Sequence, residues 1–273
     1  MIRKTLISLL AISLIACGAG KSNQQDTSQN HYPDLNIFAN KYLNTTKNDT
    51  AITAISITAQ CGNLEPKTVI AGVMGHDDLT HNIKDDDIFR IASITKSFVS
   101  VVLLQLENDP QYKAQQFNID DSVGKWFPEY PKWQNITIRQ LLNMTSGIPD
   151  YDLALFKNYT TPDMNKFKSY INPLDIVNLV YQQNIDFTPG TDWEYSNTNY
   201  LLLGFLVQKI TGNDLGTEIK NRIIDKLQLK NTYYVSNLPQ EIINPTRLVH
   251  GMWSLTVYTT LLTTSWDFGA GNM

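Results

Sequence analysis

The chain has 273 residues, of which 42% are hydrophobic and 18% are charged, and its formal net charge is −4. This length suits one large or two small globular domains with a substantial core. The mild acidity argues against a nucleic-acid partner, because nucleic-acid binding calls for a basic face. The four histidines are scattered, and no cluster has metal-ligand spacing. We therefore expect neither a metal nor another cofactor.

Residues 1–16 have the pattern of a bacterial export signal. A basic pair precedes an apolar run that is too short to span a bilayer. The run ends in Leu-Ile-Ala-Cys-Gly around Cys17, which looks like the lipobox of bacterial lipoproteins, in which the cysteine is lipidated and begins the mature chain. The alternative is an ordinary cleaved signal peptide that happens to contain Cys17. We expect a lipid-anchored protein at the periplasmic face of a membrane in the bacterial envelope.

Residues 17–32 are rich in Gly, Ser, Asn and Gln and show no periodicity, which is typical of a flexible tether. The folded part is expected to cover residues 33–273. Cys61, the other cysteine, lies in a strand-like run. We expect it to be a small buried side chain without a disulfide partner.

The folded part is predicted to begin with a helix and two strands. Proline and aspartate open a helix that ends near residue 44. Two strands follow at residues 51–60 and 67–75, joined by a turn at Gly62. An almost wholly apolar run then predicts a helix after Ser93 that is buried on most sides. The later expected elements are helices at 137–144, 173–184, 198–210 and 215–227, and a β-prone stretch at 247–264.

Four polar side chains break the apolar helix that follows residue 93. Ser93, Lys96, Ser97 and Ser100 have the spacing of one helix face. A lysine on an apolar helix is costly unless it is paired or functional. One turn after a serine, it gives the hydroxyl a candidate proton acceptor, which outlines a nucleophile–base pair. The alternative is an N-cap serine and a lysine whose charge reaches solvent.

A second candidate motif, Tyr195-Ser196-Asn197, precedes the predicted helix at 198–210. In an extended segment Tyr195 and Asn197 point to the same side. A nearby ammonium such as that of Lys96 favours the ionised phenol, which could accept the Ser93 proton and later protonate a leaving group. The alternative is that Ser196 or Asn197 caps the helix and Tyr195 only packs.

Taken together, these motifs resemble the serine penicillin-recognising family. Ser93-x-x-Lys96 and Tyr195-x-Asn197 match the branch of the class C β-lactamases and D-alanyl-D-alanine carboxypeptidases. The segment Leu-Leu-Asn-Met-Thr-Ser-Gly-Ile-Pro-Asp-Tyr, residues 141–151, is similar to that branch's Leu-Leu-x-x-Thr-Ser-Gly segment. Further stretches that look like the secreted carboxypeptidases of actinomycete type are residues 195–212, 221–223 and 265–266. The resemblance covers about residues 33–273.

The resemblance implies an α+β fold of the β-lactamase/transpeptidase type. Such a fold has a five-stranded antiparallel sheet flanked by helices, beside an all-α subdomain that we place at residues 117–238. By the family pattern Ser93 is the acylated nucleophile, Lys96 and Tyr195 manage its proton, and Asn197 holds the substrate amide. Phe156 and Trp266 match positions that wall the substrate pocket, although packing in the core is the alternative for both.

The sequence departs from the family's pattern at the third motif. It is a Lys/His-Thr/Ser-Gly on an edge strand, and that strand donates one of the two backbone N–H groups of the oxyanion hole, Ser93 N–H being the other. Neither Lys-Thr-Gly nor His-Thr-Gly occurs in the sequence. We therefore expect the last strands and the C-terminal helix to be missing. The chain taken alone would then be inactive, unless a second chain supplies those strands.

The function implied is that of a serine hydrolase working through an acyl-enzyme. We expect a D-alanyl-D-alanine carboxypeptidase that acts on peptidoglycan peptides. A class C-type β-lactamase and an esterase share the acyl-enzyme step and stay open as alternatives. An alternative of another class is a truncated lipoprotein without catalysis. The expected partners are D-Ala-D-Ala peptides or β-lactams and, through the N-terminal lipid, a membrane, but no nucleic acid.

Overall fold

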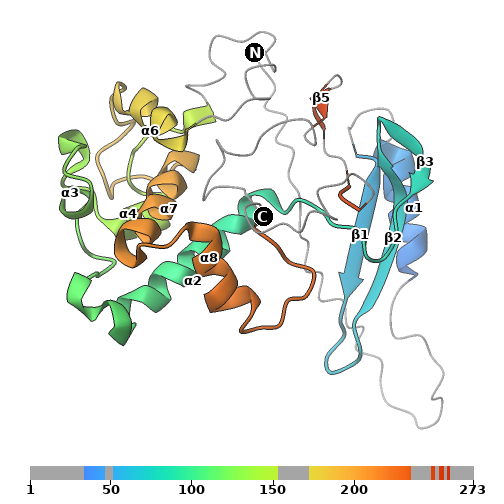
Figure 1. Ribbon diagram of the computed structural model, residues 1–273. Helices are drawn as coiled ribbons and strands as arrows, with labels where there is room; N and C mark the ends of the chain where they lie inside the picture. The colour runs from blue at the N-terminus through green and yellow to red at the C-terminus, as the bar shows by residue number, and fades with distance from the viewer. Residues whose placement is uncertain are drawn as a thin grey trace, which may run out of the picture. The chain divides into compact units, whose positions relative to one another are not determined.

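The structure is a computed structural model that describes residues 34–46, 52–152, 172–234, 247–249, 252–254 and 257–258 (Figure 1). The chain divides into two compact units. One comprises residues 1–89 and 242–260, and the other comprises residues 90–241 and 261–273. Cys17, Phe156 and Trp266, to which the sequence assigned lipidation and pocket roles, lie outside the described residues.

The described residues of the first unit form a small antiparallel sheet and a helix. Its strands are β1 (Ala54–Ala59), β2 (Lys67–Gly75) and β3 (Asp78–Asn82), hydrogen-bonded in the order β1-β2-β3. Helix α1 (Leu35–Thr46) starts where the Asp34 carboxylate accepts the N–H groups of Asn36 and Ile37. Apolar side chains of α1 and β2 then pack together in a small core of Leu35, Ala39 and Val69.

The same unit holds a second pair of strands. They are β4 (Met252–Ser254) and β5 (Val257–Tyr258), which pair antiparallel within the stretch predicted to be β-prone. Strand β3 was not predicted, because its sequence Asp-Leu-Thr-His-Asn is polar. Cys61 was predicted to be a buried thiol, and this was wrong. It lies partly exposed just after β1 and is disulfide-bonded.

The second unit is helical throughout its described residues, apart from one isolated bridge between Ser122 and Thr137. Helix α7 packs against α2, α4, α6 and α8, so it is the element around which this unit is built (Figure 1). The helices are η1 (Ala92–Ile94), α2 (Thr95–Glu107), η2 (Pro110–Gln115), α3 (Val123–Trp126), η3 (Pro131–Trp133), α4 (Ile138–Leu142), α6 (Pro173–Tyr181), α7 (Asn197–Thr211), α8 (Leu215–Ile219) and η5 (Lys220–Ile224).

Two of these helices differ from the prediction. The expected helix at 215–227 is the short α8 followed by a π-helical turn, η5. Helix α2 was predicted to be buried on most sides, but its apolar residues Val101 and Leu104 are 41% and 47% exposed. The end of α7 follows the prediction, since Gly212 adopts the left-handed conformation, with φ 76°, that closes a helix.

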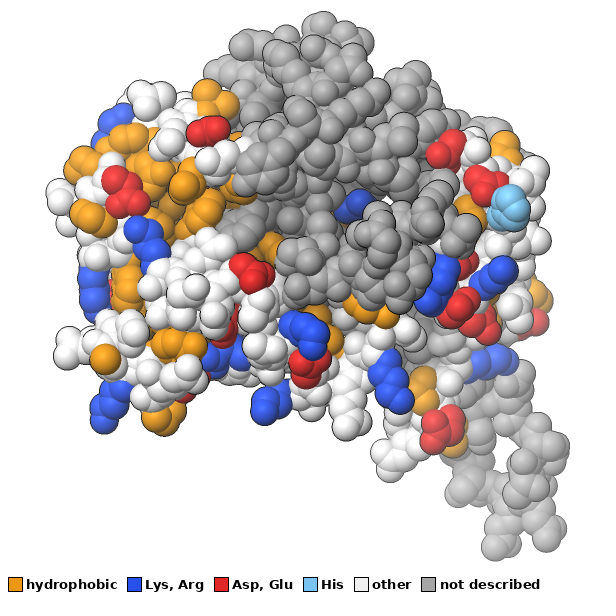
Figure 2. All heavy atoms as spheres, in the orientation of Figure 1, with side chains coloured by type: hydrophobic (Ala, Val, Ile, Leu, Met, Phe, Trp, Pro, Cys, Tyr) orange, Lys and Arg blue, Asp and Glu red, His pale blue; other side chains and the backbone are white. Residues whose placement is uncertain are grey.

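The surface of the described residues carries both signs of charge. On the face shown in Figure 2, basic and acidic side chains are interspersed. No helix among the described residues combines the length and the apolar character needed to cross a bilayer. Within the same ranges, no group of three or more His, Cys, Asp or Glu side chains could hold a metal ion.

Candidate active site

Ser93 lies at the entrance to helix α2. It is the middle residue of the 3₁₀ turn η1, which runs directly into α2, and it is exposed. The residue before it, Ala92, has φ 44°, a left-handed value that an alanine rarely adopts. Backbone strain of this kind is concentrated at functional sites, where the surrounding structure maintains it. The chain therefore holds the Ser93 hydroxyl outward at the N-terminal end of a helix.

Two side chains converge on the Ser93 hydroxyl. Lys96 Nζ donates a hydrogen bond to Ser93 Oγ at 3.0 Å, and the Tyr195 hydroxyl donates another at 2.7 Å. Lys96 is only 6% exposed, whereas Tyr195 is 38% exposed. The nitrogen of Lys96 also lies 4.9 Å from the centre of the Tyr195 ring. Serine, lysine and tyrosine thus form one contact group, and either partner could take the serine proton once it is itself deprotonated.

Asn197 completes this group. Its Oδ1 accepts a hydrogen bond from Lys96 Nζ at 2.7 Å, so the ammonium is shared between Ser93 and Asn197. Asn197 is the first residue of α7, and Tyr195 lies two residues before it. The structure therefore brings together four of the six side chains that were predicted to act on substrate. The other two, Phe156 and Trp266, lie outside the described residues.

The Thr-Ser-Gly segment holds the start of α7 in place. Ser146 Oγ donates to Asn199 Oδ1 at 2.8 Å, and the backbone carbonyl of Pro149 accepts from the hydroxyls of Ser196 and Thr198 at 3.2 and 2.7 Å. Ser146, Ser196, Thr198 and Asn199 are each at most 2% exposed. Because buried hydrogen bonds are costly to break, these contacts fix where Tyr195 and Asn197 point.

Asp150 is a contact of the site that the sequence did not single out. Its carboxylate accepts hydrogen bonds from Asn197 N at 3.1 Å and from Asn197 Nδ2 at 3.3 Å. Asp152 Oδ2 accepts a further bond from Asn197 Nδ2 at 3.3 Å. Burial raises the pKa of Asp150 above its ordinary value, and this effect outweighs the hydrogen bonds from Asn197 and the charge of Lys96, which lower it.

A second layer lies behind Lys96. Ser100 Oγ donates to the Lys96 carbonyl at 2.9 Å and lies 3.0 Å from the hydroxyl of Tyr200. The ring centre of Tyr200 is 5.6 Å from Lys96 Nζ, and its hydroxyl donates to the carbonyl of Leu142. Burial raises the pKa of the Tyr200 phenol. Its neutral hydroxyl therefore suits a packing and hydrogen-bonding role behind the lysine.

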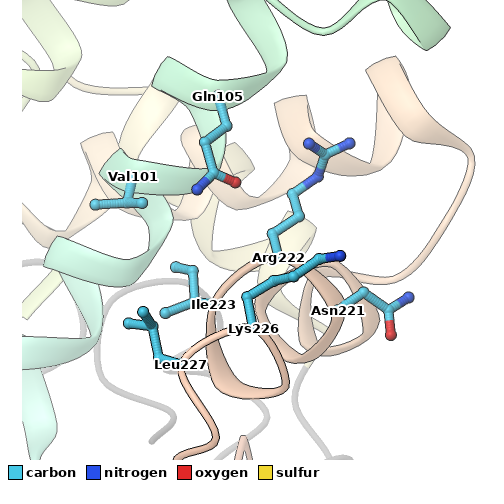
Figure 3. A pocket seen from close by; sticks show the side chains of 7 residues that line it. All are labelled: Val101, Gln105, Asn221, Arg222, Ile223, Lys226 and Leu227. Carbon is cyan, nitrogen blue, oxygen red and sulfur yellow. The ribbon is translucent and has the colours of Figure 1, made fainter.

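An apolar hollow elsewhere in this unit involves none of the site residues. Figure 3 shows it between α2 and the turn around η5, with Val101 and Gln105 on one side and Ile223 and Leu227 on the other. Ser93, Lys96, Tyr195 and Asn197 do not line it. The candidate chemistry therefore belongs to the surface at the start of α2.

The comparison with known families decides the classification. The model of the family described as Beta-lactamase matches residues 65–249, a stretch that contains all four clustered side chains. The chain belongs to the beta-lactamase family. Its fold is accordingly of the β-lactamase/transpeptidase type, as the resemblance implied, with a small antiparallel sheet and helices.

Relatives of this beta-lactamase family member are known by sequence and by structure. Penicillin-binding protein 4* of Bacillus subtilis is 33% identical over 153 residues, which are 55% of this chain and 31% of that protein. A D-stereospecific amidohydrolase from Streptomyces sp. is 28% identical, with a TM-score of 0.70, over 88% of this chain and 68% of that one. The D-amino acid amidase of Ochrobactrum anthropi SV3 is 25% identical, with a TM-score of 0.67, over 88% and 66%.

The matched lengths differ between the two sets of proteins. The chain spans about a third of the length of the curated relatives that it matches, 31% in Penicillin-binding protein 4* of Bacillus subtilis and in Protein flp of Staphylococcus aureus. It spans about two thirds of the solved amidohydrolases, 68% and 66%. Family and fold follow from these matches, whereas the activity is a separate question.

Proposed function

We propose that this member of the beta-lactamase family is a serine hydrolase that forms an acyl-enzyme on Ser93. The finer proposal is a D-alanyl-D-alanine carboxypeptidase that acts on peptidoglycan peptides. One observation carries the serine hydrolase proposal: the Lys96 side-chain nitrogen and the Tyr195 hydroxyl both lie within hydrogen-bond distance of Ser93 Oγ, at 3.0 and 2.7 Å. A serine is a weak nucleophile by itself, and a base in contact with it provides the activation that acyl transfer needs.

The contacts support the following reaction. Ser93 Oγ attacks the carbonyl carbon of the scissile amide, and its proton passes to whichever of Lys96 and Tyr195 is deprotonated. A C–O bond forms, and the negative charge moves to the carbonyl oxygen, which can face the Ser93 N–H within η1. The amide C–N bond then breaks, and the leaving amine takes the proton back. Water hydrolyses the ester on Ser93 by the reverse proton path.

A second candidate is hydrolysis of D-amino acid amides. It is favoured by the two solved amidohydrolases above, one a D-stereospecific amidohydrolase and the other a D-amino acid amidase. Both candidates share acyl transfer from an amide that belongs to a D-residue. They differ in the leaving group, which is D-alanine in the first case and ammonia in the second. A class C-type β-lactamase and an esterase remain alternatives, since they use the same acyl-enzyme step.

A panel of substrates tests these proposals. The purified protein is incubated with an acyl-D-Ala-D-Ala peptide, D-alanine amide, their L-counterparts, a chromogenic cephalosporin and a p-nitrophenyl ester. The carboxypeptidase proposal predicts release of D-alanine from the peptide and little turnover of either L-compound, whereas no turnover of any substrate would favour the alternative without catalysis. Ser93→Ala is the control and should abolish all turnover. Faster turnover of D-alanine amide, the cephalosporin or the ester would replace the carboxypeptidase by the corresponding alternative.

We further propose that the protein is attached to a membrane of the bacterial envelope through a lipid on Cys17. The support is the sequence alone, namely the short apolar run that ends at Cys17 and the polar stretch at residues 17–32. Such an anchor would place the Ser93 site close to the cell wall, where peptidoglycan peptides occur.

A further inference from the structure

The carboxamide of Asn197 is held from two sides. On one side its Oδ1 accepts from Lys96 Nζ at 2.7 Å. On the other side its Nδ2 donates to Asp150 Oδ2 and Asp152 Oδ2, both at 3.3 Å. Asn197 is only 8% exposed, so its polar atoms depend on these partners. The acceptor end of the amide thus faces a hydrogen-bond donor, and its donor end faces acceptors.

This arrangement leaves only one favourable orientation for the amide. A lysine ammonium has hydrogen-bond donors and no acceptor, while an ionised carboxylate has acceptors and no donor. If the carboxamide turned over, its NH₂ would face the Lys96 ammonium and its oxygen would face the carboxylates of Asp150 and Asp152. Both contacts would become repulsive. The carboxylates therefore determine that the oxygen of Asn197 points to Lys96.

Asp150 is the stronger of the two anchors. It accepts the backbone N–H of Asn197 at 3.1 Å as well as the side-chain NH₂, whereas Asp152 accepts one bond from this residue. The side chain of the N-cap residue, Ser196, makes no capping hydrogen bond to α7. Asp150, which lies outside the helix, instead accepts the backbone N–H of the first helical residue. One carboxylate therefore positions both the backbone and the side chain of Asn197.

We propose that Asp150 is a positioning residue for the reaction: it fixes the carboxamide of Asn197 and, through it, the place and charge of Lys96 beside Ser93. The inference rests on the proposed serine hydrolase function. Asp150 does not touch Ser93 in this arrangement, and its influence passes along the hydrogen bonds from Asp150 to Asn197 and from Asn197 to Lys96. Its negative charge also favours the protonated form of groups near it.

The charged and titratable groups around Lys96 determine how a substitution at Asp150 changes the titration of the base. Tyr195, before α7, and Tyr200, on α7, face the lysine nitrogen with their rings. Asp150, which follows α4, and Asp152, which lies in the helical pair of residues 151–152, face it through Asn197. Asp150→Asn removes one negative charge, and both a lysine and a tyrosine lose a proton more easily when a nearby negative charge is removed. The titration of the base therefore moves to lower pH whether Lys96 or Tyr195 is the base.

The test measures the rate of Ser93 acylation by a fluorescent penicillin between about pH 5 and 10, a range chosen to cover lysine and tyrosine titration. In Asp150→Asn we expect acylation to be about 10- to 100-fold slower, the loss typical of a hydrogen bond to a charged group. We also expect the midpoint of the pH profile to move to lower pH. Asp175→Asn is the matched control, because Asp175 is an exposed acid in the first turn of another helix, α6.

The pH midpoint separates positioning from a merely structural role. A slower Asp150→Asn variant with an unmoved midpoint would overturn the inference, and so would a variant that reacts like wild type or like Asp175→Asn. Asp150→Glu retains the charge and should retain the wild-type midpoint. If Asp150→Asn did not fold, an Asp150→Glu variant with a shifted midpoint would overturn the proposal, and an unshifted one would support it.

A second readout does not depend on activity. If wild type is not acylated by the penicillin, the carboxypeptidase proposal loses its support, and the positioning role is then decided by NMR. The titration of the Lys96 side chain is followed with labelled lysine, and Lys96→Arg assigns the signal. In Asp150→Asn the lysine should lose its proton at lower pH than in wild type. An unchanged titration would overturn the inference by itself.

Discussion

Lys96 is a buried lysine of the helical unit, and two hydrogen bonds satisfy its side-chain nitrogen. Its ammonium contacts Ser93 and Asn197 while the side chain is 6% exposed. A buried charge costs stability even when paired, and groups retained for function are frequently not optimal for stability. We predict that Lys96→Ala abolishes acylation of Ser93 without lowering the melting temperature. Lys209→Ala, at an exposed lysine of the same unit, is the control. Wild-type acylation in Lys96→Ala would contradict the assignment.

Asp150 makes stability depend on pH in a defined direction. Burial raises its pKa from the ordinary 3.8, so the folded state binds this proton more tightly than the unfolded state. The stabilisation from that proton is complete below the unfolded value and is lost as the pH rises through the folded value. We predict that, from about pH 4 to pH 7, the free energy of unfolding falls more or rises less in wild type than in Asp150→Asn. Urea denaturation at both pH values measures this. Equal changes in the two proteins would contradict it.

The site residues differ in how far the sequence could predict them. Ser93, Lys96, Tyr195 and Asn197 are parts of two short motifs, and local spacing already places each pair on one side of the chain. Asp150 was visible only as part of the Thr-Ser-Gly segment. Its role depends on a contact with Asn197, 47 positions away, and such long-range pairing leaves no periodic signal in one sequence. Tyr200 was missed for the same reason, because it reads as one more apolar residue of α7.

At the scale of elements, the turn at Gly147 connects the Thr-Ser-Gly segment to the site. Gly147 has φ 74°, and a Cβ there would collide with the carbonyl oxygen of Phe187. Gly212, which ends α7, has nearly the same φ of 76° with open space around it. We predict that Gly212→Ala costs about 1–2 kcal/mol, from backbone strain alone. Gly147→Ala should cost about 1–3 kcal/mol more, since the clash adds to that strain, and should also slow acylation.

Denaturant unfolding of the two glycine variants measures this difference. The matched φ values cancel the backbone contribution, so the difference isolates the contact with Phe187. If both variants lost the same stability, the close packing of this segment would not contribute to the site.

Element boundaries show where sequence patterns are informative. The predicted strand at 67–75 coincides with β2, and the start of α6 at Pro173 coincides with the predicted one. Both have strong local signals, namely β-branched residues and a proline at the first helical position. Strand β3 has no such signal, and it forms because its backbone pairs with β2. The π-helical turn after α8 lies against α2, a long-range contact that no local pattern encodes.

At the scale of the whole molecule, the two cysteines give opposing indications of whether the protein carries a lipid anchor. A lipid thioether on Cys17 would leave Cys61 without a partner in its own chain, yet Cys61 is disulfide-bonded in the structure. We predict that the protein fractionates with membranes and that Cys17→Ser releases it. Cys61→Ser is the control and should leave the protein in the membrane fraction. Unchanged membrane retention of Cys17→Ser, or a mass spectrum of the N-terminal peptide without acyl chains, would contradict the lipid anchor.

The central claim is that Ser93 is the residue that becomes acylated. It follows from the convergence of Lys96 and Tyr195 on one hydroxyl and from membership of the beta-lactamase family. The direct measurement treats the protein with a fluorescent penicillin, digests it and locates the adduct by mass spectrometry. We predict one adduct on the peptide that contains Ser93, and none in Ser93→Ala. An adduct on another residue, or equal labelling of Ser93→Ala, would contradict the account.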